Sequence, residues 1–170
     1  MKIDLSSVIK VTGAEVKFSG DAGFNNAEFL GEDYRFDEPL KITGRIYNNG
    51  QSLTLEADVT GNMVTECARC LDEIRVDVGF SVNELLSQRK ENDAESEDII
   101  LFDGYEIELD EIIADHFLMN ISGRYLCSED CKGLCPTCGK NLNEGDCDCD
   151  NDYIDPRWQA LADILNQTKE

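Results

Sequence analysis

Eight cysteines constrain this chain of 170 residues more than any other feature of its sequence. Six of them fall between Cys127 and Cys149, and the other two form a Cys-x2-Cys pair at Cys67 and Cys70. A reducing compartment rarely keeps structural disulfides, so clustered cysteines in an intracellular protein indicate metal or redox chemistry. The positions of the cysteines therefore bear on both the fold and the chemistry of the chain.

The start of the chain indicates an intracellular protein. Asp4 follows Lys2 and Ile3, and no apolar segment typical of a secretory signal comes after them. No apolar run approaches the roughly 18 residues that are needed to span a bilayer. We therefore expect a soluble, cytoplasmic protein that has no membrane partner.

The first half of the chain has the pattern of strands. Apolar residues recur at every second position over residues 53–65 and again over 74–82, which is the period of a half-buried strand. Residues 14–18 show a shorter alternation, and Asn48-Asn49-Gly50 is a strong hairpin turn signal. The sequence predicts an α+β fold. Its centre is an antiparallel sheet or partly closed barrel built from hairpins, with a few helices and a cysteine-rich zinc knuckle module.

Further elements are expected after residue 98. Two short strands are predicted at 99–102 and 105–109, and Asp110 is the predicted N-cap of a helix. One side of this helix carries Ile112, Ile113, Phe117 and Asn120. It also holds His116, the single histidine of the chain, which we interpret as a packed or surface residue rather than a metal ligand.

These patterns predict three parts. Residues 1–124 form an α+β core domain with a mobile acidic loop at 88–98, where Ala94 is the single apolar residue. Residues 125–150 form a cysteine-rich zinc module that packs on the core. Residues 151–170 form a C-terminal amphipathic helix, with Asp155 as N-cap and Pro156 at its first position.

The cysteine spacing is typical of zinc knuckles. Cys67 and Cys70 lie where one alternating strand ends and the next begins, so a turn can point both thiols at one ion. In Cys135-Pro136-Thr137-Cys138-Gly139, proline stiffens the turn and glycine permits a positive φ. All eight cysteines are candidate metal ligands: Cys67, Cys70, Cys127, Cys131, Cys135, Cys138, Cys147 and Cys149.

Eight thiols suffice for two structural zinc ions, each held by four. The preferred division gives the last four cysteines to one ion, because they are closest in sequence, and leaves Cys67 and Cys70 to join Cys127 and Cys131. The rival division pairs the two Cys-x2-Cys knuckles, as in a zinc ribbon. Spare thiols with one zinc ion also fit the sequence, which does not choose among these arrangements.

Other chemistries of the cysteines fit less well. Iron or an iron–sulfur cluster suits four thiolates equally well, but the knuckles and the glycine favour a mononuclear site. A thioredoxin-like redox pair opens a helix in a βαβ unit, whereas Cys67 and Cys70 lie between strands. Four thiols close a site completely, and neither a catalytic zinc motif nor a phosphate-binding or hydrolase motif occurs in the sequence. We therefore expect a protein that is not an enzyme.

The charge of the chain bears on its partners. Thirty-six acidic residues against fifteen lysines and arginines give a formal net charge of −21. Nucleic-acid binding depends on cations that neutralise phosphates, so direct binding of naked nucleic acid is not expected. The same field attracts basic proteins. An alternative is a local patch around Lys41, Arg45 and Arg75 on the hairpins, although Glu56 and Asp58 are expected to interleave with it.

The cysteine motifs resemble those of a known family. They are Cys-x-Arg-Cys-Leu at 67–71, the long Leu-Cys-x3-Cys-Lys-Gly-Leu-Cys-Pro-x-Cys-Gly motif that begins at Leu126, and Cys-x-Cys at Cys147 and Cys149. Asp-Pro-Arg at 155–157 follows them before the terminal helix. This arrangement is similar to the YceD family, the large ribosomal RNA subunit accumulation proteins.

The resemblance implies a bacterial or organellar factor that is needed for normal amounts of large-subunit ribosomal RNA. It carries no catalytic residue over to this chain. Together with the charge, it suggests a zinc-binding, non-enzymatic factor that acts on a basic ribosomal protein or a large-subunit assembly intermediate. The alternatives are a direct RNA-binding protein that acts on precursor ribosomal RNA and a thiol-redox protein.

Overall fold

A computed structural model describes residues 1–22, 28–29, 32–33, 35–89, 99–149 and 156–158. The chain forms two compact units. The sheet unit consists of Met1–Glu66 and Glu73–Tyr125, and the cysteine unit consists of Cys67–Asp72 and Leu126–Glu170. The turn that holds the first two cysteines therefore belongs with the later cysteines rather than with the strands that flank it.

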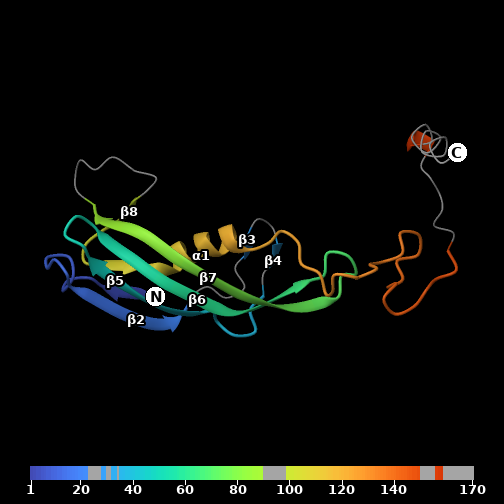
Figure 1. Ribbon diagram of the computed structural model, residues 1–170, viewed down its shortest axis with the longest axis horizontal. Coiled ribbons are helices and arrows are strands. Elements are labelled where there is room, and N and C mark those ends of the chain that lie inside the picture. The colour runs from blue at the N-terminus through green and yellow to red at the C-terminus, as the bar shows by residue number, and fades with distance from the viewer. Residues whose placement is uncertain (23–27, 30–31, 34, 90–98, 150–155, 159–170) are drawn as a thin grey trace, which may run out of the picture. The chain divides into compact units, whose positions relative to one another are not determined.

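The sheet unit contains nine strands and one α-helix among the described residues. They are β1 (Lys2–Asp4), β2 (Glu15–Asp21), β3 (Glu28–Phe29), β4 (Glu32–Asp33), β5 (Lys41–Asn48), β6 (Leu53–Glu66), β7 (Glu73–Gln88), β8 (Ile99–Phe102), β9 (Glu106–Glu108) and α1 (Leu109–Asn120). The main sheet has the order β2-β5-β6-β7-β8, and β1-β9 and β3-β4 form small two-stranded sheets. In Figure 1 the long strands β5, β6 and β7 run side by side and the main sheet curls.

The hairpin turn at the end of β5 is the one that the sequence predicts. Gly50 has φ +92°, and the Asn49 side-chain oxygen accepts hydrogen bonds from the backbone N–H groups of Gln51 and Ser52 at 2.9 Å. This turn fixes an antiparallel register in which Arg45 lies opposite Glu56. A one-residue slip would turn the apolar face of β6 toward water, so pattern and turn select the same register.

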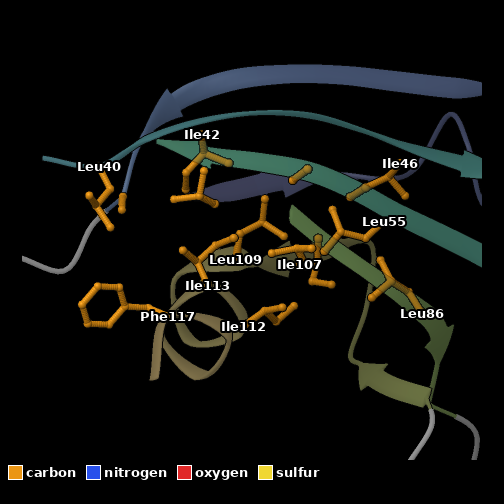
Figure 2. Packing of buried hydrophobic residues seen from close by; sticks show 14 of the residues in the cluster. Leu40, Ile42, Ile46, Leu55, Leu86, Ile107, Leu109, Ile112, Ile113 and Phe117 are labelled. Carbon is orange, nitrogen blue, oxygen red and sulfur yellow. The ribbon is translucent and has the colours of Figure 1, made fainter. Parts of the chain in front are cut away.

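The core of the sheet unit lies between the main sheet and α1. Figure 2 shows Ile112, Ile113 and Phe117 of α1 together with the strand residues Ile42 and Leu55 of the same cluster. All five side chains are buried, and they belong to one continuous hydrophobic cluster. The alternating apolar residues of the strands therefore pack on the sheet face that α1 covers, as the period of two requires.

The start of α1 corrects two details of the sequence interpretation. Its N-cap is Glu108, which makes no side-chain capping bond, and Asp110 lies in the first turn. Asp110 forms an ion pair with the N-terminal amino group of Met1 instead. Pairing of β1 with β9 brings Met1 to this position, and no local pattern signals such a pairing. Asn120, expected beside Phe117 on one side of the helix, is exposed.

Several other expectations have a partial outcome. The strands expected at 99–102 and 105–109 are present as β8 and β9. Strand β8 pairs with β7 in parallel, so the main sheet is mixed, where an antiparallel sheet was expected. One α-helix is described, where a few were expected. Residues 90–98 of the expected acidic loop, and all of the expected C-terminal helix except Pro156–Trp158, lie outside the described residues. Those three form a short 3-10 turn. Among the described residues, no helix has the length and apolar character that crossing a membrane requires.

Candidate metal centres

The first cluster of thiols joins two segments of the cysteine unit. Cys67 and Cys70 lie in the turn that connects β6 to β7, and Cys127 and Cys131 follow the sheet unit in sequence. The Sγ atoms of Cys67 and Cys131 are 3.8 Å apart, and those of Cys70 and Cys127 are 3.6 Å apart. All four sulfur atoms lie within 4.8 Å of one another, so these residues could hold one metal ion.

These distances fit a tetrahedral zinc ion. With Zn–S bonds of about 2.3 Å, a regular tetrahedron places its sulfur atoms about 3.8 Å apart. The two measured separations of 3.8 and 3.6 Å agree with that value. The sulfur atoms thus have the spacing of a coordination shell, which is longer than the roughly 2 Å bond of a disulfide.

The second cluster forms within one short segment. Cys135, Cys138, Cys147 and Cys149 also have their sulfur atoms within 4.8 Å of one another. The backbone closes around them, because the Cys135 N–H donates to the Lys140 carbonyl at 2.8 Å. The Lys140 ammonium group in turn donates to the Asp146 carbonyl at 2.6 Å. This short link holds the two halves of the loop together.

The two knuckles share one backbone geometry. Leu71 N–H donates to the Cys67 carbonyl at 2.9 Å, and Gly139 N–H donates to the Cys135 carbonyl at the same distance. Both residues adopt the left-handed backbone conformation, with φ +61° at Leu71 and +74° at Gly139. Glycine takes this conformation without cost, whereas a leucine is strained in it.

Two side chains outside the predicted ligand set support the first cluster. The Arg69 guanidinium group donates to the carbonyls of Glu129 at 3.2 Å and Cys131 at 2.7 Å, which ties the knuckle to the second cysteine pair. The Asn143 amide donates to the sulfur of Cys131 at 3.3 Å. Sequence reasoning missed both roles, because these contacts join residues that share no motif spacing.

Backbone amides favour the thiolate form of one cysteine in each knuckle. The N–H groups of Cys70 and then Arg69 lower the pKa of Cys67 to about 6. The N–H groups of Cys138 and Thr137 likewise lower the pKa of Cys135 to about 6.

The environment of Cys149 acts in the opposite direction. A hydrogen bond with the Cys138 sulfur, and then burial, raise the pKa of Cys149 to about 12. A divalent cation at the centre would favour the thiolate form instead, and metal binding to thiols releases their protons. The electrostatics of the cluster therefore suit a metal-bound state better than an empty one.

The grouping of the eight thiols is the preferred division. Each Cys-x2-Cys knuckle lies in a separate cluster, so the rival pairing of Cys67 and Cys70 with the second knuckle is not formed. His116 belongs to the sheet unit, where its ring Nε2 lies 2.8 Å from a carboxylate oxygen of Glu84. It is absent from both sulfur clusters.

Sulfur atoms occupy the buried positions in the described part of the cysteine unit. Its buried side chains there are the thiols of Cys67, Cys70, Cys131 and Cys135. Small segments with little buried apolar surface usually need a disulfide, a metal or a partner to fold. The donor sets and the burial of the described residues are both compatible with metal binding.

The basic side chains considered for RNA binding are largely paired with carboxylates. Arg45 lies 2.8 Å from a Glu56 oxygen and 3.6 Å from a Glu15 oxygen, and Arg75 lies 2.8 Å from an Asp37 oxygen. The expected interleaving is present at Glu56, whereas Asp58 accepts a hydrogen bond from the Ser81 hydroxyl and Arg75 pairs with Asp37 instead. Lys41, the third residue of this patch, lies opposite Thr60 on the neighbouring strand.

Comparisons with known proteins agree with the cysteine motifs. The family model of YceD, described as large ribosomal RNA subunit accumulation protein YceD, matches residues 55–165. The protein YlbN of Bacillus subtilis is 24% identical over 171 residues, which covers 100% of this chain and 99% of YlbN. No solved structure matches the chain.

Two further relatives match over part of their length. The protein ML1660 of Mycobacterium leprae is 30% identical over 75% of this chain, and the match covers 59% of ML1660. A protein of Arabidopsis thaliana named large ribosomal RNA subunit accumulation protein YCED homolog 1, chloroplastic, is 32% identical over 65 residues. That match covers 38% of this chain and 20% of the Arabidopsis protein.

Proposed function

Because the chain belongs to the YceD family, we propose that it promotes the accumulation of large-subunit ribosomal RNA as a zinc-stabilised, non-enzymatic assembly factor. The observation that carries this proposal is the family match over residues 55–165, which spans the cysteine motifs. The name of the Arabidopsis relative gives the direction of the expected effect, an increase in the amount of large-subunit RNA.

A structural role for zinc follows from the donor sets. Four thiols in each cluster complete a tetrahedron, whereas a catalytic zinc keeps one position open for water or substrate. The single histidine, which could have served as a general base, lies in the sheet unit. We therefore assign zinc the task of folding the cysteine unit into a zinc knuckle module, and no reaction.

The partner is a basic ribosomal protein or an assembly intermediate that presents one. A net charge of −21 attracts basic surfaces over several ångströms and accelerates their encounter. Naked RNA would meet the same charge as repulsion, and the ion pairs of Arg45 and Arg75 leave these cations less able to bind phosphate. Protein recognition accounts for the composition better than direct RNA binding.

A deletion strain tests the function. Loss of the gene is expected to lower large-subunit ribosomal RNA relative to small-subunit RNA, and to reduce large subunits in sucrose gradients. Complementation with the intact chain should restore both, whereas a chain with Cys67→Ser and Cys135→Ser should not. Normal RNA levels and normal subunit profiles after deletion would contradict the proposed function.

A crosslinked pull-down from growing cells identifies the partner class. If a basic ribosomal protein is retained after nuclease treatment, the contact is made to protein. If RNA is recovered alone, the charge argument is wrong and direct RNA binding replaces it.

A further inference from the structure

Strand β7 has a long backbone edge that no described residue covers. Its first edge pairs with β6 from Glu73 to Leu86, whereas β8 covers the second edge only from Leu85 to Gln88. Figure 1 shows the short β8 beside one end of the long β7. Over Glu73–Glu84, the second edge of β7 is thus unpaired within the part of the chain that the structure describes.

Hydrogen bonds near the ends of the strand determine which residues face this edge. Val64 on β6 donates its N–H away from β7, to the Arg35 carbonyl, so its register partner Arg75 makes no bond to Val64. Arg89 donates its N–H to the Phe102 carbonyl on the β8 side. Alternate residues of an antiparallel pair point their backbone groups to the same side. The free edge therefore consists of the backbone groups of Glu73, Arg75, Asp77, Gly79, Ser81 and Asn83.

This edge lacks several common means of preventing strand addition, although charged side chains are present at Glu73, Arg75 and Asp77. Natural sheets block an exposed edge with charged side chains, above all lysine, or with proline, a bulge or a short strand. The stretch Glu73–Glu84 contains neither lysine nor proline, and its register with β6 is unbroken. Gly79 lies at its middle, and a Cβ atom built there would meet nothing within 4 Å. A glycine at such a position allows another backbone to approach closely.

The opposite edge of the sheet is different. Among the described residues, strand β2 is also unpaired on its outer side, but it spans only Glu15–Asp21 and carries Lys17 at its centre. A lysine at this point is a known means of discouraging an added strand. The sheet therefore has one short, blocked edge and one long, open edge.

We propose that the open edge of β7 binds an extended segment of a basic protein in which apolar residues alternate with lysine or arginine. Such a strand would place its apolar side chains beside Ile74 and Val76, which are half-buried at the edge of the core. Its basic side chains would lie on the exposed face beside Asp77, since Glu73 is already paired with Arg35. A second copy of this chain is disfavoured as the occupant, because each copy carries a charge of −21.

This inference rests on the proposed function, since it gives a surface to the basic partner. It adds a chemical class of ligand, an extended basic and apolar strand, and a mode of recognition through main-chain hydrogen bonds. The deletion strain judges the ribosomal role separately, so the two can fail independently.

Amide hydrogen exchange with a synthetic peptide tests the edge. The probe is a twelve-residue peptide of alternating lysine and valine, and the control is a peptide of alternating glutamate and valine. In the free full-length protein, the amides of Arg75, Gly79 and Asn83 should exchange fast. The basic peptide should slow them at least about tenfold, as expected for amides that gain a hydrogen bond.

Two substitutions at one position provide a matched pair. Gly79→Pro removes an outward N–H and leaves the β6 ladder intact, whereas Gly79→Ala keeps that N–H and fits the open space. Gly79→Pro should weaken peptide binding by about tenfold, and Gly79→Ala should bind as the intact chain does. Ser19→Pro, at an outward position on β2, should have no effect on binding.

The outcomes separate the alternatives. If the β7 amides are already protected in the free protein, a segment of the chain itself covers the edge and the proposal is wrong. It is equally wrong if the peptide protects β2 instead, if neither strand is protected, or if Gly79→Pro binds as well as Gly79→Ala. Should Gly79→Pro fail to fold, the exchange data on the intact chain still decide. Full rescue of the deletion strain by folded Gly79→Pro would reject the edge while the ribosomal role stands.

Discussion

The two units of this protein bury different kinds of atoms. The sheet unit encloses a continuous cluster of aliphatic and aromatic side chains, in which Leu5, Ile46 and Phe117 have no exposed surface. In the cysteine unit, the described buried side chains are thiols. A hydrophobic core folds whenever water is present, but a cluster of thiols needs a cation to become stable. We therefore expect the two units to depend on different sources of stability.

Removal of metal should produce the largest difference in stability between the two units. The chelated protein, or Cys131→Ser, should lose the fold of the cysteine unit, because structural zinc sites supply on the order of 10 kcal/mol. The sheet unit should keep its fold, since its core lies within Met1–Glu66 and Glu73–Tyr125. Two-dimensional NMR of the full chain, with metal content measured in parallel, reports on both units at once.

Ser128→Ala is the matched control for this substitution. It lies in the same segment as Cys131 and provides no ligand to either cluster. It should retain the metal and the NMR spectrum of the intact chain. An unchanged spectrum and melting curve in chelated protein would refute the dependence on metal.

A substitution in the hydrophobic core should have the opposite effect: it should destabilise the sheet unit and leave the cysteine unit folded. Phe117 is fully buried on α1, and its ring packs edge to face against Phe36 with 5.4 Å between the centroids. Phe117→Ala should lower the free energy of unfolding of the sheet unit by about 3–5 kcal/mol, through lost burial and a cavity. Metal stoichiometry should be unchanged. Met119→Ala, at an exposed position on the same helix, should change the stability little.

The residue that follows each knuckle has a left-handed backbone conformation, and opposite substitutions at these two positions should change the stability by smaller amounts. Leu71 is 59% exposed at φ +61°, so Leu71→Gly loses little packing and should stabilise the metal-bound cysteine unit by about 1 kcal/mol. Gly139→Leu should destabilise it by a similar amount, because the space around Gly139 is open and only the backbone is strained.

Denaturant unfolding of the cobalt-loaded protein, followed by thiolate absorption, measures both variants. If Leu71→Gly lowers the midpoint instead, Leu71 makes a stabilising contact that outweighs its strain.

The sequence was sufficient where physical signals are local. The period of two predicted β6 and β7, the Asn-Gly turn predicted the hairpin at Gly50, and sequence proximity predicted the second thiol cluster. What it missed depends on long-range pairing. Asp110 has the composition of an N-cap but pairs with the chain terminus, because β1 lies beside β9.

The same limit applies to the candidate site. The four thiols of the first cluster are evident as a set of residue types, but the Arg69 and Asn143 bonds that support it are not. They depend on a backbone arrangement that forms only once the segments meet. The free edge of β7 was equally hidden: the sequence predicted a strand at 99–102, but not that it pairs with only the last residues of β7.

The smallest expected effect concerns an ion pair on the solvent-exposed face of the main sheet, opposite the face that packs on the hydrophobic core. The hydrogen bond from the Arg45 side chain holds the pKa of Glu56 below its ordinary value of 4.5. Because the folded pKa is lowered, the contribution of this pair is present above the unfolded pKa and is lost as the pH falls through the folded one. Arg45→Ala should return the pKa of Glu56 toward 4.5, as measured by NMR titration of the carboxyl carbon. Lys41→Ala, opposite Thr60, should leave it unchanged, and an equal shift in both variants would mean that general charge rather than this pair sets the pKa.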